Sequence, residues 1–166
     1  MIPQIKKILY ATDLSKNSAY AFYYAVDMAK KYGAEIVILH TIELIPAYAR
    51  AYGSKMDTAQ QDQLGVSKEV IRNRLQKFCE KVEEKNSLAC LSLVAKTLVQ
   101  VGYPVEEILK AADVEGCDLI VMGNHGKGFL QHAFLGCVSR SVLDRTRKPV
   151  VMIPLPSEKS SIWDEM

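Results

Sequence analysis

The sequence predicts a doubly wound α/β domain built on a five-stranded, mostly parallel sheet. Short, strongly apolar segments alternate along the chain with longer segments whose apolar residues recur at helical spacing. Runs such as Ile36-Val37-Ile38-Leu39 are typical of strands covered on both faces. Alternating strands and helices are joined by right-handed crossovers, which produce a parallel sheet with helices on both sides. The order of the strands is not visible in this pattern.

The expected elements follow one another without an internal repeat or a domain linker. Strands are expected at 5–11, 35–42, 91–101, 118–123 and 149–154. The first helix should begin at the N-cap Ser15 and end at Gly33, since these residue types favour a helix start and stop. Further helices are expected at 64–86, around 105–112 and within 136–147, and the irregular stretch 43–63 is expected to be a long loop.

Length, charge and cysteine usage narrow the class of protein. A chain of 166 residues is one domain by size, and we expect that domain at 1–154 with a polar C-terminal tail at 155–166. The net charge of +2 and its even distribution argue against nucleic-acid or membrane partners. The first apolar run is too short for a signal peptide, so a cytoplasmic protein is expected. The four widely spaced cysteines suggest reduced, mostly buried thiols rather than a zinc site.

A glycine-rich segment follows directly on the strand expected at 118–123. Gly123, Gly126 and Gly136 are spaced G-x2-G-x9-G, and Gly128 lies in the same loop. Glycine lets the backbone approach a phosphate closely, and the first turn of the helix that follows offers N–H groups without intrahelical partners. Spacing alone therefore predicts an anion at the start of that helix. The alternative is a flexible loop with no ligand.

This segment does not match the P-loop or the dinucleotide-binding motif. It lacks the Gly-Lys-Ser/Thr ending of a P-loop, and it is not the dinucleotide motif GxGxxG. Its position fits a binding site all the same, because ligands of open α/β sheets bind beyond the carboxyl ends of the strands. Lys127 and Arg140 add positive charge nearby.

The order and spacing of these motifs resemble the ATP-binding branch of the universal stress protein family. The resemblance is carried by the glycine pattern after a buried strand and by KPVV at 148–151 behind the helix. KILYATD at 7–13 is similar to that family's first strand and acidic residue, and VGYP at 101–104 matches a turn before a helix. The resemblance covers residues 5–154.

The resemblance implies the fold of the adenine-nucleotide alpha-hydrolases, with strand order 3-2-1-4-5. The first and fourth strands would then be neighbours, which would bring the loop at Asp13 beside the loop at Gly123. The implied ligand is ATP, or AMP or ADP, with Mg²⁺ held by phosphates and water. The implied assembly is a homodimer in which the edge strand Val150–Ile153 pairs with its copy.

The resemblance also implies a role for individual residues. Asp13 would accept a hydrogen bond from the ribose, and Thr41 would lie beside the adenine. Met122 and Gly123 would border the sugar and phosphates. The full set implied to bind nucleotide is Ala11, Thr12, Asp13, Thr41, Met122, Gly123, His125, Gly126, Gly136, Cys137, Val138 and Ser139.

Two positions depart from the family's pattern. Cys137 stands where Ser or Thr is usual, and a thiol is a weak donor, so weaker binding is expected. Thr41 stands where an aliphatic residue is common. Residues 13 and 125 also keep alternative interpretations, since Asp13 could cap the first helix with Ser15 and His125 could face solvent.

The expected function is that of a nucleotide-responsive regulatory or stress-response protein with an unknown protein partner. No catalytic residue is predicted, because no general base is recognisable, and any ATP hydrolysis would be slow. One alternative is a dimeric scaffold of the same family that binds no nucleotide, which Cys137 favours. The other is an enzyme acting on adenylates, but the HxGH and SGGxDS signatures of such enzymes do not occur.

Overall fold

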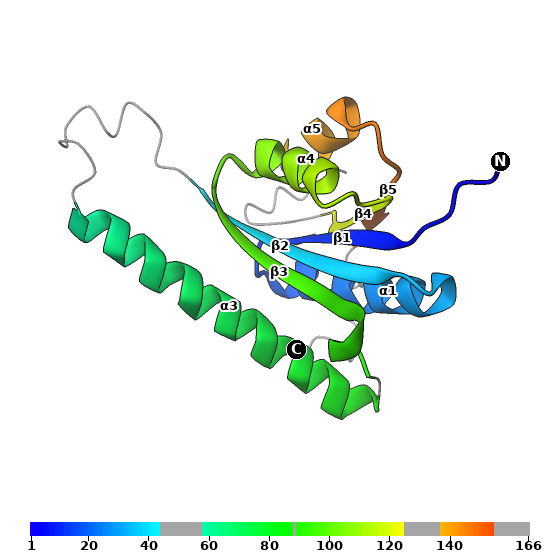
Figure 1. Ribbon diagram of the computed structural model, residues 1–166, viewed down its shortest axis with the longest axis horizontal. Helices are drawn as coiled ribbons and strands as arrows, with labels where there is room; N and C mark the ends of the chain where they lie inside the picture. The colour runs from blue at the N-terminus through cyan, green and yellow to red at the C-terminus, as the bar shows by residue number, and fades with distance from the viewer. Residues whose placement is uncertain (44–57, 88, 125–136, 155–166) are drawn as a thin grey trace.

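The computed structural model describes residues 1–43, 58–87, 89–124 and 137–154 (Figure 1). Several sequence predictions lie outside this part of the chain: most of the loop expected at 43–63, the glycine-loop residues His125, Gly126 and Gly136, and the tail 155–166.

The structure has one five-stranded sheet in which every pair of neighbouring strands is parallel. Its order is β3-β2-β1-β4-β5, which confirms the fold class and the strand order implied by the resemblance. The strands are β1 (Lys7–Thr12), β2 (Glu35–Glu43), β3 (Val94–Gly102), β4 (Leu119–Gly123) and β5 (Val150–Ile153).

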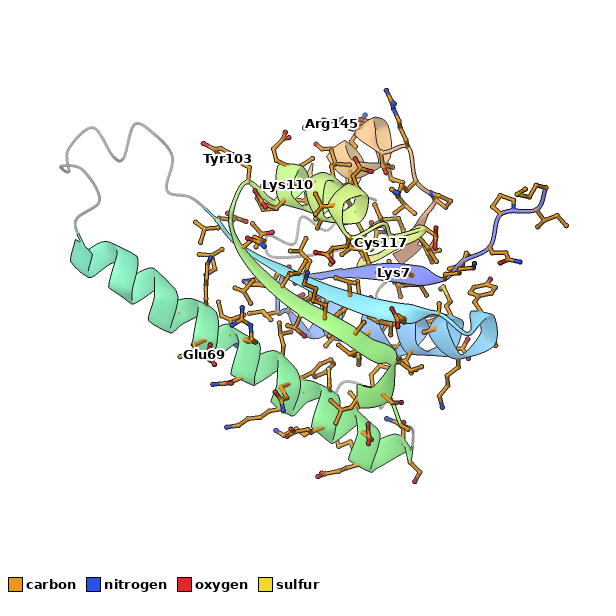
Figure 2. All side chains as sticks on the ribbon, in the orientation of Figure 1. Lys7, Glu69, Tyr103, Lys110, Cys117 and Arg145 are labelled. Atoms are coloured by element: carbon orange, nitrogen blue, oxygen red, sulfur yellow. The ribbon has the colours of Figure 1, made fainter. Side chains whose placement is uncertain are left out.

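Helices cover both faces of the sheet (Figure 1). They are α1 (Lys16–Tyr32), α3 (Thr58–Asn86), α4 (Pro104–Val114) and α5 (Cys137–Arg145). A hydrophobic cluster lies between the sheet and the helices on each of its two faces, because alternate residues of each strand point to opposite faces. One joins β-strand residues such as Ile8 and Tyr10 to α1 and α3. The other joins Leu9 and Ala11 to α4 and α5. Figure 2 accordingly shows Lys110 of α4 and Arg145 of α5 on the side of the sheet opposite Glu69 of α3.

The limits of α1 follow the signals in the sequence. The Ser15 side chain accepts a hydrogen bond from the Ser18 N–H at 3.2 Å, as an N-cap should. Gly33 ends the helix with a left-handed φ of +64°, which a residue with a Cβ adopts at a cost. Between these ends, Phe22 and Val26 are buried on the face that packs against the sheet.

Two expected boundaries are wrong by three residues or more. Helix α3 begins at Thr58, inside the stretch 43–63 that was expected to be a loop. The added residues are polar, so they carry no apolar period, but they include good helix formers and neither Pro nor Gly before Gly65. Residues 91–93 form a 3₁₀ turn instead of the start of β3, with the Leu93 N–H bonded to the Cys90 carbonyl at 3.0 Å. The alternation of Leu91 and Leu93 imitates a strand.

Among the described residues, no helix is long and apolar enough to cross a membrane.

The side chain of Asp118 holds the amino ends of β1 and β4 together. One carboxylate oxygen accepts hydrogen bonds from the Lys6 and Lys7 backbone N–H groups, at 2.9 and 3.0 Å. The Asp118 N–H in turn donates to the Lys7 carbonyl at 2.8 Å. These bonds hold β1 and β4 together at their amino ends. The candidate site lies at the opposite, carboxyl end of the same two strands.

We expect Asp118→Ala to lower the free energy of unfolding by about 1.5 kcal/mol, because two backbone donors lose a charged acceptor. Asp118→Asn keeps an acceptor oxygen and should cost less. Urea denaturation of both variants checks this. Equal losses in the two variants would contradict the role assigned to the carboxylate.

Candidate functional site

The sheet reverses its order between β1 and β4. From β1 the chain passes through α1 to β2 on one side, whereas β4 and β5 lie on the other side. Parallel α/β sheets bind ligands in the crevice outside the carboxyl ends of two such strands. The cross-strand partners Ala11 and Met122 are both buried near that end of the pair.

The loop between β1 and α1 is held by its own side chains. Thr12 is buried, and its Oγ1 accepts a hydrogen bond from the Leu14 N–H at 3.0 Å and shares another with the Ser18 hydroxyl. The half-buried Asp13 accepts at Oδ1 from the Ser15 N–H at 2.9 Å. The Asp13 carboxylate therefore does support the start of α1, as the capping interpretation proposed, and its position at the strand end is fixed.

Leu14 is strained within this loop. Its φ of +65° lies in the left-handed region, which costs a residue with a branched side chain about 1–3 kcal/mol. The hydrogen bond to Thr12 and the packing of the Leu14 side chain against the core between α1 and α3 offset that cost. The surrounding structure thus holds the loop that contains Asp13 in one backbone conformation.

Two further hydrogen bonds fasten the loop to the rest of the molecule. The hydroxyl of the fully buried Tyr10 donates to the Ser18 carbonyl at 2.6 Å. Burial raises the pKa of the Tyr10 phenol well above its usual range, so the hydroxyl remains a donor. His40, buried within β2, donates from Nδ1 to the Thr12 carbonyl at 2.8 Å. This network joins β1, α1 and β2 at the edge where the site lies.

The end of β4 meets the beginning of α5. The buried Ser139 donates from its hydroxyl to the Gly123 carbonyl at 3.3 Å. The Asn124 N–H extends the ladder to β5 by donating to the Ile153 carbonyl at 2.9 Å. Cys137 is exposed and Val138 half-buried, so the first turn of α5 lies at the surface beside the end of β4.

Thr41 lies on the other side of β1. Thr41 is half-buried and pairs with Gln100 of β3. The residue before it, His40, pairs with Thr12 of β1. The Thr41 backbone is therefore level with Asp13. The structure brings these predicted residues to one edge of the sheet: Ala11, Thr12, Asp13, Thr41, Met122, Gly123, Cys137, Val138 and Ser139. His125, Gly126 and Gly136 lie outside the described residues.

Three cysteines have the environment that the sequence suggested. Cys79, Cys90 and Cys117 are buried free thiols, and burial raises the pKa of Cys79 to about 12 and of Cys117 to about 11. Thiols of this kind are unreactive near neutral pH. In the described part of the chain, no three His, Cys, Asp or Glu side chains are grouped so that they could hold a metal ion.

The model of the universal stress protein family matches residues 4–154 of this chain. The chain belongs to the universal stress protein family. Universal stress protein MJ0577 of Methanocaldococcus jannaschii is 31% identical over 156 residues, covering 89% of this chain and 94% of the relative. A universal stress protein of Thermus aquaticus is 33% identical over 151 residues, covering 89% of this chain and 98% of the relative.

Solved universal stress proteins share the fold. The structure of MJ0577 superposes with a TM-score of 0.73 at 26% identity, covering 94% of this chain and 100% of that one. A universal stress protein solved in complex with cAMP gives a TM-score of 0.58 at 22% identity, covering 91% of this chain and 98% of that one.

In this universal stress protein, we expect Tyr10→Phe to lower the free energy of unfolding by about 1 kcal/mol, because a buried hydrogen bond is lost. The melting temperature should fall by about 2–4 °C. The control Tyr32→Phe changes an exposed tyrosine at the end of α1 and should leave stability within about 0.5 kcal/mol. Equal melting temperatures for the two variants would show that the Tyr10 hydroxyl does not stabilise the loop.

Proposed function

We propose that this protein binds an adenine nucleotide, ATP or its relatives AMP and ADP, beyond the carboxyl ends of β1 and β4. The proposal depends on one observation: these two strands are neighbours at the point where the sheet order reverses, and the first turn of α5 is bonded to the end of β4. Binding there would change the surface around the site, which suits a nucleotide-responsive regulatory protein.

The phosphates would lie against α5. The first N–H groups of a helix have no intrahelical partners and carry the positive end of the helix dipole, so they favour an anion. The backbone N–H groups of Cys137, Val138 and Ser139 occupy that turn. The sequence places Gly126 and Gly136 in the connection between Gly123 and this turn. Replacing the usual hydroxyl by the Cys137 thiol leaves the backbone N–H in place, so we expect weakened binding rather than none.

The nucleoside would lie across the end of β1. Asp13 is fixed by its bond to the Ser15 N–H and offers carboxylate oxygens to the ribose. Thr41 on β2, which is level with Asp13, would lie beside the adenine. The floor of the nucleoside site would be formed by Ala11, Thr12, Met122 and Gly123. This arrangement runs from β2 across β1 to β4 and α5, in the order adenine, ribose, phosphates.

The role that we assign to this site is nucleotide binding. Mg²⁺ would be held by phosphate oxygens and water, since the described residues offer no ligand cluster. We assign no catalytic residue, and hydrolysis would be slow, because we identify no group that orients water among the residues that the structure describes.

One comparison supports nucleotide binding. The relative solved with cAMP resembles this chain at the level of the fold, and its ligand is an adenine nucleotide. The family match to 4–154 supports one domain at 1–154, with 155–166 as a tail. A cytoplasmic location also belongs to the proposal.

We expect nucleotide-free protein to bind ATP with Mg²⁺ in calorimetry. Asp13→Asn should weaken that binding about tenfold, because a hydrogen bond to a charged group contributes about 1.5 kcal/mol. Asparagine keeps the oxygen that accepts from Ser15, so the loop should persist. The control Asp27→Asn alters an exposed carboxylate of α1 that pairs with Lys31, and it should bind like the wild type.

Absence of binding by the wild type at millimolar ATP would contradict the proposed function and favour the scaffold alternative. Equal affinities for the wild type and Asp13→Asn would contradict the role of Asp13 alone.

We also propose a homodimer through β5. This strand lies at one edge of the sheet, and the side chains of Val150, Val151 and Met152 are half-buried in one protomer. An apolar edge strand invites pairing unless it is covered. If β5 paired antiparallel with its copy in a second protomer, the backbone N–H and C=O groups of both edge strands would be hydrogen-bonded in a two-fold symmetric contact.

The ladder between β4 and β5 shows which residue tests the dimer. The Pro149 and Ile153 carbonyls accept from β4, so odd-numbered residues of β5 turn their backbone groups to β4 and Met152 turns its own outward. We expect Met152→Pro to yield monomers in light scattering while the fold is kept, since proline is tolerated on an outward edge. Met152→Val keeps the N–H and should stay dimeric. A wild-type monomer at tens of micromolar would contradict this interface.

A further inference from the structure

One buried polar atom at the edge of the candidate site has no partner. The side-chain oxygen Oδ1 of Asn124 is buried and makes no hydrogen bond in the described structure. Native structures leave few buried acceptors in this condition, so each such group needs an explanation, and a partner that binds there is one. Asn124 comes directly after β4, beside the start of the glycine-rich segment.

The position of Asn124 is fixed by the sheet. Its N–H continues the β4–β5 ladder by donating to the Ile153 carbonyl at 2.9 Å. Ile120 and Met122 belong to the cluster that faces α4 and α5, and alternation places Asn124 on the same face. That is the face that α5 covers, because Val138 and Val142 belong to the same cluster. The Ser139 hydroxyl also donates to the Gly123 carbonyl.

The same register brings Asn124 level with Asp13. Ala11 pairs with Met122 across β1 and β4, and Asp13 and Asn124 each follow two residues later, directly beyond the ends of these strands. Both contribute oxygen acceptors at this point. A ligand group that bonds to oxygens of both side chains must therefore donate hydrogen bonds or carry positive charge.

The chemistry of an adenine nucleotide narrows the choice. Ionised phosphates have no proton to donate, which leaves the adenine amino group and the two ribose hydroxyls as donors. In the proposed arrangement the adenine lies toward Thr41 on β2, on the far side of β1 from Asn124. The ribose lies between the adenine and the phosphates, next to the end of β4.

We propose that the Asn124 amide oxygen accepts a hydrogen bond from a ribose hydroxyl and makes this site selective for ribonucleotides over deoxyribonucleotides. This inference rests on the proposed function and goes beyond it. A site with an acceptor placed for a hydroxyl discriminates against analogues that lack the hydroxyl, because the acceptor is then buried without a partner. Mg²⁺ bound to the oxygen is the competing account.

Calorimetry with ATP, 2′-deoxyATP and 3′-deoxyATP tests the inference, each with and without Mg²⁺. We expect the wild type to bind one of the deoxy analogues about tenfold more weakly than ATP. Asn124→Leu and Asn124→Ala remove the acceptor, so both should bind ATP about tenfold more weakly and should bind that analogue as well as ATP. The matched variant Asn124→Asp keeps an acceptor and should keep the discrimination.

A second measurement needs no nucleotide. If the oxygen has no partner in the protein, Asn124→Leu should melt at the same temperature as the wild type or higher. A marked loss of stability would show that the protein itself satisfies the oxygen, and would overturn the inference.

The outcomes separate the two proposals. Failure of the wild type to bind any of the three nucleotides overturns both. Binding by the wild type with unchanged discrimination in Asn124→Leu and Asn124→Ala overturns the inference about Asn124 alone. An effect of these variants that appears with Mg²⁺ and vanishes without it assigns the oxygen to the metal, and also overturns the inference.

Discussion

The parallel pairing of β1 with β4 is the constraint on which the candidate site depends. It aligns Ala11 with Met122 and so brings the residues that follow both strands to the same edge of the sheet. Asp118 fixes the amino end of this pair through the Lys6 and Lys7 N–H groups. At the carboxyl end, the bonds of Tyr10 and His40 hold the β1–α1 loop in one conformation, including the strained Leu14. Without that pairing, Asp13 and the start of α5 would not lie at the same edge of the sheet.

The fold could be predicted from the sequence because β1, β2 and β4 each contain a strongly apolar run, and because α1 has clear start and stop residues. Ser15 and Gly33 limit α1 as expected. The order of the strands needed the family resemblance, since periodicity contains no information about which strands are neighbours. The start of α3 at Thr58 was missed because its polar first turns have no apolar stripe, and the turn at 91–93 was missed because two leucines at a spacing of two imitate a strand.

The candidate site was predicted in part. Motif order identified the ends of β1 and β4 and the start of α5, and the structure brings Asp13, Gly123 and Ser139 to one edge. The bond from His40 to Thr12 was not predictable, because it joins residues on two strands whose register the sequence does not reveal. Asn124 was missed because a side chain between two glycines of a loop motif shows no periodicity. What marks it is an unpaired buried oxygen, which is a property of the folded chain.

The most direct test of the account is an NMR titration of backbone amides with ATP and Mg²⁺. The account predicts saturable shifts that are largest at Thr12, Asp13, Gly123 and Asn124 and in the first turn of α5. The amides of Lys7 and Asp118, at the opposite end of the same strands, should hardly move. Saturable shifts confined to another part of the molecule, or none at millimolar ATP, would contradict a nucleotide site at the ends of β1 and β4.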